Sequence, residues 1–185
     1  VDDIRGLSWK LRLAIQFFVA TTCVVSQEWY FTAFIPYRII TVGCTVFWIV
    51  MLINSFNMLD NMDAAAGGVA VICSIALVFY VVLLGVTSEG PQLYVAGLLL
   101  VFIGALLGFL IHNKPPAKIF MGDAGSYFVG FCIAVATILT TYTDGENPVA
   151  HAVIAPLIIM AVPIYDLLTV VVIRLSDGRS PFQPD

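Results

Sequence analysis

Charged residues are scarce in this chain. Lys, Arg, Asp and Glu together supply 11% of its residues, whereas hydrophobic residues supply 61%. Soluble globular domains average about 25% charged and roughly 45–50% apolar residues. The composition therefore excludes an ordinary soluble domain and predicts an integral membrane protein. We expect the membrane as a partner and no nucleic acid.

Cysteine is also rare, and no two cysteines have the spacing of a metal site or a redox motif. Each lies alone in an apolar run, at Cys23, Cys44, Cys73 and Cys132. We expect buried, unreactive thiols rather than a metal site.

The chain lacks the usual beginning of a membrane protein. It starts Val1-Asp2-Asp3, without an initiator Met or the basic segment that opens a signal peptide. We interpret it as a fragment of a longer chain.

Long apolar runs fill the sequence. A transmembrane helix needs about 20 mostly apolar residues, and six stretches approach this length. They are roughly Leu11–Gln27, Tyr37–Leu59, Ala66–Thr87, Leu93–Ile111, Ser126–Thr143 and Val149–Ile173. We predict an all-α fold, a polytopic bundle of about six transmembrane helices that forms a single domain over residues 1–185.

The basic residues predict the orientation of the bundle. If the six spans alternate, only Arg38 falls on one side of the membrane. Basic residues favour the cytoplasmic side of a membrane protein, so the other side is predicted to be cytoplasmic. Its seven basic residues are Arg5, Lys10, Arg12, Lys114, Lys118, Arg174 and Arg179.

Four polar residues repeat at intervals of three near the end of the second span. Asn54, Asn57, Asp60 and Asp63 therefore form one stripe on the closing turns of a helix and its exit. Asn inside a membrane helix often only bonds a neighbouring helix. Four residues in register that end in two carboxylates favour a functional site.

A second polar segment covers residues 112–126. Lys114 and Lys118 flank paired prolines, which favour an extended loop, and Asp123 lies between two glycines at the start of the next span. Amides at a helix N-terminus suit phosphate, and a carboxylate there suits a Mg²⁺–diphosphate complex. Alternatively, Asp123 only caps the helix.

Together these motifs resemble those of the polyprenyl-phosphate N-acetylhexosamine-1-phosphate transferases, a glycosyltransferase 4 type family. Four blocks match in the family's order. They are Asp2-Asp3 with Lys10, residues 54–63, residues 113–126, and Pro163-Ile164-Tyr165-Asp166 followed by Arg174 and Gly178-Arg179-Ser180-Pro181-Phe182.

The chain departs from the family pattern in four places. Asn61 and Ala64 stand where many members have Gly, and Ala64 would be strained in a turn that needs a positive φ. Transmembrane helices before the Asp-Asp block and a histidine motif after Asp185 are absent from the sequence. These two absences support the fragment interpretation.

The resemblance implies an Mg²⁺-dependent enzyme that transfers a sugar-1-phosphate from a UDP-N-acetylhexosamine to polyprenyl phosphate and releases UMP. Mn²⁺ is an alternative metal. The implied catalytic residues are Asp2, Asp3, Asp60 and Asp123, with Asp123 as the metal ligand and Asp2 or Asp3 as the general base or orienting group. Direct displacement and an aspartyl-phosphate intermediate both remain open.

The resemblance also implies a set of substrate-binding residues. Asp63 and Asn113 would contact the edge of the uracil, and Phe120 would stack on its face. Other contacts are expected from Asn57, Lys118 and Arg179.

The expected setting is the bacterial inner (plasma) membrane, with the site on its cytoplasmic face, in the first membrane step of cell-envelope glycan synthesis such as that of cell wall or lipopolysaccharide. A homodimer is a possible assembly. The tail around Arg179 favours N-acetylglucosamine over the muramoyl-pentapeptide substrate. A non-catalytic relative and an ion-coupled transporter are the rival interpretations, although transporter sites lie near the midplane.

Overall fold

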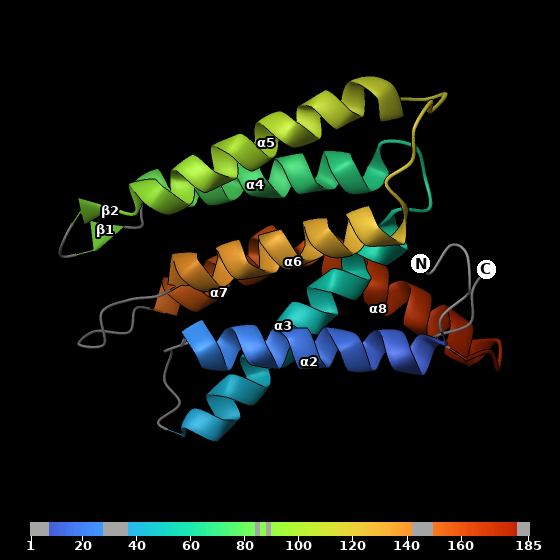
Figure 1. Cartoon of the computed structure of the whole chain (residues 1–185), viewed down its shortest axis with the longest axis horizontal. Coiled ribbons are helices and arrows are strands. Elements are labelled where there is room, and N and C mark those ends of the chain that lie inside the picture. Colours follow the sequence, from blue (N-terminus) through green and yellow to red (C-terminus); the bar gives the residue numbers. More distant parts are fainter. Residues whose placement is uncertain (1–7, 28–36, 84–85, 88–89, 142–149, 181–185) are drawn as a thin grey trace.

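A computed structural model describes residues 8–27, 37–83, 86–87, 90–141 and 150–180 of the chain. These parts form a helical bundle with one short hairpin (Figure 1). The helices are α2 (Trp9–Gln27), α3 (Arg38–Leu59), α4 (Ala65–Leu83), α5 (Leu93–Asn113), α6 (Gly122–Thr141), α7 (Ala150–Ile159) and α8 (Ala161–Ser176). The hairpin pairs β1 (Val86–Thr87) with β2 (Gly90–Pro91) in antiparallel register.

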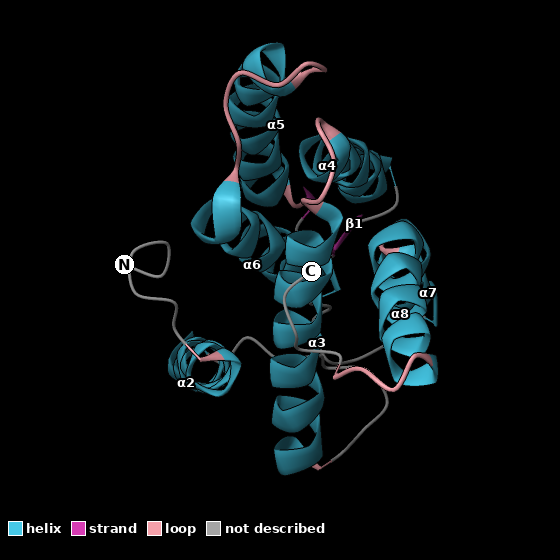
Figure 2. Cartoon of the chain, turned by 90° about the vertical axis from the view of Figure 1, so that its right-hand side faces the viewer, coloured by secondary structure: helices cyan, strands magenta, loops and turns pink. Residues whose placement is uncertain are grey.

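Helix α3 is the central element of the bundle. It packs against α2, α4, α6 and α8, and the other helices surround it in the end-on view (Figure 2). Its side chains are apolar almost throughout, so it has no wide polar face for water. The polar end of α3 therefore lies among the helices that pack against it.

Helices α3 and α6 approach each other closely at Gly130. A Cβ at this position would lie 2.7 Å from the Ile53 Cα and 2.8 Å from the Leu52 carbonyl oxygen. Small residues permit such close contact between membrane helices. Further along, the Trp48 indole N–H donates to Thr137 Oγ1 at 2.8 Å. This buried hydrogen bond fixes the register of the two helices.

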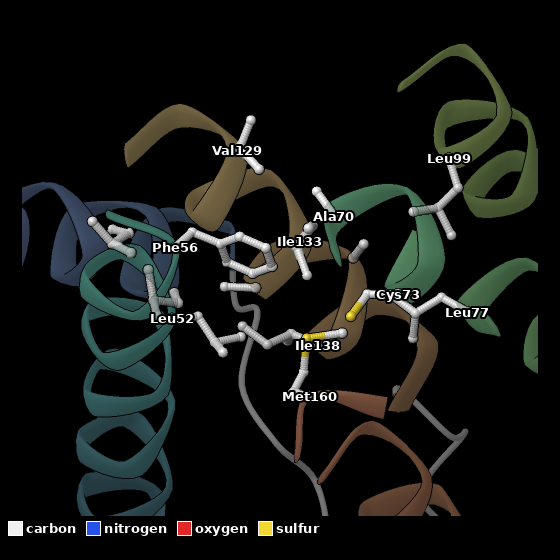
Figure 3. Close-up of a cluster of buried hydrophobic side chains, with 14 of the residues drawn as sticks. Leu52, Phe56, Ala70, Cys73, Leu77, Leu99, Val129, Ile133, Ile138 and Met160 are labelled. Atoms are coloured by element: carbon white, nitrogen blue, oxygen red, sulfur yellow. The ribbon is translucent and has the colours of Figure 1, made fainter. Parts of the chain in front are cut away.

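The core lies between α3, α4 and α6. Figure 3 shows Phe56, Leu77 and Ile133 pointing into one cluster from these three helices, and all three are fully buried. Met160, from the junction of α7 and α8, closes the cluster and is also fully buried. The chain is thus packed as one unit through residues far apart in sequence.

Four of the described helices are long and apolar enough to cross a membrane, namely α3, α4, α5 and α6. The prediction of a polytopic, all-helical membrane bundle is confirmed. Helix α2 is not among the four; it carries Lys10, Arg12 and Gln16 within its first two turns.

The last predicted span, Val149–Ile173, is not one continuous helix. The chain breaks at Met160 into α7 and α8. Pro163 has no N–H, so it cannot bond the Ile159 carbonyl four residues earlier. That carbonyl instead accepts a hydrogen bond from the Cys73 thiol of α4 at 3.3 Å. A side chain from a neighbouring helix thereby satisfies the broken backbone within the bundle.

All four cysteines lie in described helices and are free thiols. The expectation that they are buried holds only for Cys73. Cys44 is exposed, while Cys23 and Cys132 are partly buried. An exposed side chain on a membrane helix lies at the apolar outer surface of the bundle. A thiol there costs little free energy, because free cysteine behaves as a small hydrophobic residue.

The polar segments gather at one end of the bundle. Figure 1 shows the start of α2, the end of α3 and the start of α6 at its right-hand end, together with the loop that follows α5. The hairpin lies at the opposite end. The alternation predicted for these segments is therefore present in the fold.

Candidate functional site

The polar stripe at the end of α3 joins three helices. The Asn54 amide donates to Gln16 Oε1 of α2 at 2.8 Å and also to the Val50 carbonyl. One turn later, Asn57 Nδ2 donates to Asp123 Oδ1 and to Ser126 Oγ of α6, both at 3.0 Å. The stripe therefore aligns α2 and α6 on α3.

Asp123 is held by two different helices. Its Oδ1 accepts the Asn57 hydrogen bond, and its Oδ2 lies 2.8 Å from Arg12 Nη1 of α2. The Asp123 side chain is 38% exposed and that of Arg12 is 31% exposed. The carboxylate is thus oriented by polar groups yet remains accessible from outside the bundle.

The structure separates two interpretations of Asp123. It lies in the first turn of α6, after Gly122, which has a φ of 65°. A cap would precede the first helical residue and bond amides of its own helix. The hydrogen bonds of the Asp123 side chain, among the described residues, go to Arg12 and Asn57. Orientation from α2 and α3 fits a binding group better than a cap.

Asp60 lies beside Asp123 and shares its electrostatic environment. It follows the last residue of α3, and its carboxylate accepts a hydrogen bond from the Gly122 N–H. Burial raises the pKa of the Asp60 carboxyl, the Gly122 hydrogen bond lowers it, and the charge of Asp123 raises it; the net shift is upward. Two neighbouring carboxylates therefore concentrate negative charge at this end of the bundle.

Asp63 and Asn113 tie the turn after α3 to the loop after α5. The Ala117 N–H donates to Asp63 Oδ2 at 2.9 Å. Asn113 accepts from the Ala64 N–H at 2.9 Å and donates to the Ile119 carbonyl at 2.8 Å. Asn113 is buried. Both side chains hold the walls of the site in this structure, and their contact with a nucleotide base stays a prediction.

The departure from the family pattern at Ala64 has a structural consequence. Ala64 has a φ of 63°, in the left-handed region that favours glycine. The turn therefore does need a positive φ there, and Ala64 adopts it under strain. Its N–H is anchored by Asn113 and its carbonyl accepts from Gly68 as α4 begins.

The remaining predicted substrate-binding residues lie around this site or beyond it. Lys118 and Phe120 are exposed on the loop before α6, so both can reach a ligand from the solvent side. Arg179 follows α8, and its Nη2 lies 3.4 Å from Asp177 Oδ2. Within the part of the chain that the structure describes, no hydrogen bond or ion pair joins Arg179 to Asp123. Asp2 and Asp3 lie outside the described residues.

The donor set fits a hard divalent cation that also binds a substrate. Within the described ranges, no three His, Cys, Asp or Glu side chains form a group able to enclose a metal. Mg²⁺ is commonly held by one or two carboxylates plus substrate phosphates rather than by a full protein cage. Asp123 and Asp60 supply such a pair, with helix α6 amides beside them.

Sequence reasoning missed two residues that orient the site. Arg12 was assigned only to membrane orientation and Gln16 was not singled out, yet they contact Asp123 and Asn54. Both lie on the face of α2 whose later positions, Ala20 and Val24, are buried. A polar residue at this spacing on the inward face of an apolar helix was the available signal.

Comparison with known proteins agrees with this arrangement. The model of glycosyl transferase family 4 matches residues 1–141. The chain is 32% identical to the "Probable undecaprenyl-phosphate N-acetylglucosaminyl 1-phosphate transferase" of Bacillus subtilis over 194 residues. It is 31% identical to the "Decaprenyl-phosphate N-acetylglucosaminephosphotransferase" of Mycobacterium leprae and to the "Undecaprenyl-phosphate alpha-N-acetylglucosaminyl 1-phosphate transferase" of Escherichia coli.

These alignments cover 100% of this chain and 51% of each of the three relatives. The chain therefore spans about half the length of the curated relatives it matches. The family match covers most of the chain, including the Asn54–Asp63 stripe and the Asp123 loop that form the site. The chain belongs to glycosyl transferase family 4.

Proposed function

We propose that the whole protein transfers N-acetylglucosamine-1-phosphate from its UDP-sugar to a polyprenyl phosphate and releases UMP. The reaction takes place at the end of the bundle that carries Asp60 and Asp123, on the cytoplasmic face of the bacterial plasma membrane. Mg²⁺ is the metal, with Mn²⁺ as an alternative. The names of the relatives, all N-acetylglucosamine phosphotransferases, support this choice of sugar.

One observation carries the proposal. Asn57 and Asp123 are 66 residues apart, belong to different blocks, and meet at 3.0 Å at one end of the bundle. Asp60 lies beside them and repels Asp123 electrostatically. A carboxylate pair at the end of membrane helices suits two substrates that meet there, a soluble nucleotide and a lipid headgroup. This position is unlike the midplane site of a transporter.

The chemistry follows from bringing two phosphate groups together. An oxygen of the lipid phosphate becomes bonded to the phosphorus that carries the sugar. The bond from this phosphorus to the bridging oxygen breaks, and UMP leaves with the electron pair. A divalent ion, when bound, would neutralise the phosphate charges as they approach. Asp123 and Asp60 would hold this ion, Asp2 or Asp3 would take or orient the proton of the lipid phosphate, and Lys118 would attract the diphosphate.

The exposed Phe120 lies on the loop between α5 and α6, and Asp63 and Asn113 each form a hydrogen bond to that loop. Together these three residues form the proposed nucleotide side of the site. Stacking on an aromatic ring holds a base with little dependence on which base it is, because every base has a π-face. Asn57 orients Asp123, and Arg179 is proposed to approach the substrate from α8.

The test is a transfer assay in membranes that contain the full-length protein. Radiolabel from UDP-N-acetylglucosamine should appear in polyprenyl diphosphate, with release of UMP. If the protein uses only the muramoyl-pentapeptide nucleotide, the proposed sugar is wrong, but the proposed type of transfer reaction is still right. Absence of transfer from every UDP-N-acetylhexosamine, with the protein folded, would contradict the enzyme proposal and favour a non-catalytic relative.

Asp123→Asn gives the matched variant in this assay. It keeps the size of the side chain and loses its charge, so turnover should fall by roughly 10²–10³ if the charge stabilises the transition state, by analogy with loss of one electrostatic donor. Asp123→Glu should retain more activity with a changed Mg²⁺ optimum. Near-normal turnover of Asp123→Asn at limiting Mg²⁺ would overturn the metal-ligand assignment.

A further inference from the structure

Arg12 and any metal ion would bind the same carboxylate. Asp123 Oδ2 lies 2.8 Å from Arg12 Nη1, while Asp123 Oδ1 accepts from Asn57. A guanidinium and a divalent cation are both attracted to this group, and they repel each other at short range. Asn57 is a neutral amide and raises no such conflict. Of the two hydrogen-bond partners of the Asp123 side chain among the described residues, only Arg12 conflicts with a bound cation.

Without a metal, the site needs a cation. The Asp60 and Asp123 carboxylates lie close enough together to repel each other. Arg12 offsets part of this repulsion. Its guanidinium is always charged at neutral pH, so it can balance the site whenever no metal is present.

Arg12 is not the only residue that attaches helix α2 to the bundle. Gln16 lies one turn further along and accepts a hydrogen bond from Asn54 at 2.8 Å. Ala20 and Val24 continue the same face into the core and are fully buried. Release of the Arg12 side chain from Asp123 therefore does not require α2 to move. The pair is also partly exposed to solvent, which gives the side chain room to change its rotamer.

We propose that Arg12 is the resident counter-ion of Asp123: it holds the carboxylate while no metal is bound, and it leaves when a divalent cation binds. Arg12 and the cation then compete for Asp123, and Arg12 is a positioning residue that keeps the empty site folded. This inference rests on the proposed role of Asp123 as a metal ligand.

The experiment measures Mn²⁺ binding to the purified full-length protein by the electron paramagnetic resonance of free Mn²⁺. Arg12→Gln removes the competing charge and should tighten Mn²⁺ binding about 1.5- to fivefold, the range expected for loss of one partly exposed ion pair. Arg38→Gln makes the same change of charge at the opposite end of the bundle and should leave Mn²⁺ binding unchanged. Equal or weaker Mn²⁺ binding by Arg12→Gln would overturn the exchange.

Thermal unfolding supplies a second readout. Arg12→Gln should unfold at a lower temperature than wild type without metal, because Asp60 and Asp123 then repel without compensation. Saturating Mn²⁺ should restore the wild-type midpoint, since ligand binding stabilises the folded state. A midpoint that stays equally low with and without Mn²⁺ would mean that Arg12 serves only the fold, and would overturn the exchange.

Two further variants separate the possible failures. If Asp123→Asn binds Mn²⁺ as wild type does, the metal-ligand assignment fails. If Asp123→Asn loses Mn²⁺ binding while Arg12→Gln gains none, only the exchange fails.

If Arg12→Gln does not fold, Arg12→Lys replaces it in the Mn²⁺ binding experiment, because its single ammonium forms a weaker pair than the planar guanidinium. Arg12→Lys should then bind Mn²⁺ more tightly than wild type, and equal or weaker binding would overturn the exchange.

Discussion

Individual residues hold this site by contacts that cross from one loop to another. Ala64 shows the cost of such a contact, since its φ of 63° crowds the Cβ against the backbone. Its N–H is aligned on buried Asn113, whose amide also bonds the Ile119 carbonyl. The strain is therefore maintained by the hydrogen bonds that join the two walls of the site.

Ala64→Gly should stabilise the protein. Removing the Cβ relieves a penalty of about 1 kcal/mol, less the greater entropy of glycine in the unfolded chain. The melting temperature of the purified full-length protein should rise by a small, measurable amount. Ala105→Gly, in the exposed middle of α5, is the control and should lose about 0.5–1 kcal/mol. A lower melting temperature for Ala64→Gly would show that the turn is not strained.

The sequence predicted which residues form the site better than it predicted their partners. The three-residue spacing placed Asn54, Asn57 and Asp60 on one face because helical periodicity is a local property. The partner of Asp123 was not predictable in this way, because Arg12 belongs to another helix, 111 residues away. Such a pair depends on how α2 and α6 pack around α3.

The helices themselves are positioned by a small number of close contacts. Gly130 brings the α6 backbone against Ile53 and Leu52 of α3. Asn57 and Asp123 lie on these same two helices, about one turn from Ile53 and about two turns from Gly130. The distance between α3 and α6 therefore sets the geometry of the Asn57–Asp123 hydrogen bond.

Gly130→Ala should destabilise the protein and impair the site together. The added Cβ would lie 2.7 Å from a backbone atom, so the helices must separate. Overpacking of this kind costs about 1–3 kcal/mol, and transfer activity should fall with it. Gly104→Ala in α5 meets no atom within 4 Å and should be neutral or slightly stabilising. Equal melting temperatures for the two variants would contradict the close α3–α6 contact.

Helix boundaries were predictable where apolar length decides them and not where a local break does. The second, third and fourth spans match α3, α4 and α5 within a few residues, because membrane helices follow apolar runs. The break at Met160 depends on Pro163 and on Cys73 of another helix. Proline alone did not predict it, since membrane helices often tolerate proline.

At the scale of the whole molecule, the two ends of the bundle differ in character. One end carries the carboxylates and the loop of Lys114 and Lys118, and the other carries the hairpin (Figure 1). Seven of the eight basic residues of the sequence fall on or next to the first end by alternation of the spans. Because basic loops favour the cytoplasm, we propose that this end of the bundle faces the cytosol, where a nucleotide sugar would reach it.

This orientation is tested by labelling single cysteines in intact cells with a membrane-impermeant thiol reagent. The background carries no other cysteine, and Cys73→Ser is used in it because serine retains a donor for the Ile159 carbonyl. Cysteines introduced at Ser88 and Gly145, in the segments predicted to be outside, should be labelled. Cysteines at Lys114 and Ser180 should be labelled only after the membrane is permeabilised, because both positions belong to the end that carries the site.

The permeabilised sample is the control for reactivity. Protection in intact cells is informative only at a position that is labelled in this sample. Labelling of Lys114 and Ser180 from outside, with protection of Ser88 and Gly145, would reverse the orientation. It would also contradict the proposed site, because a cytosolic UDP-sugar could not then reach Asp123.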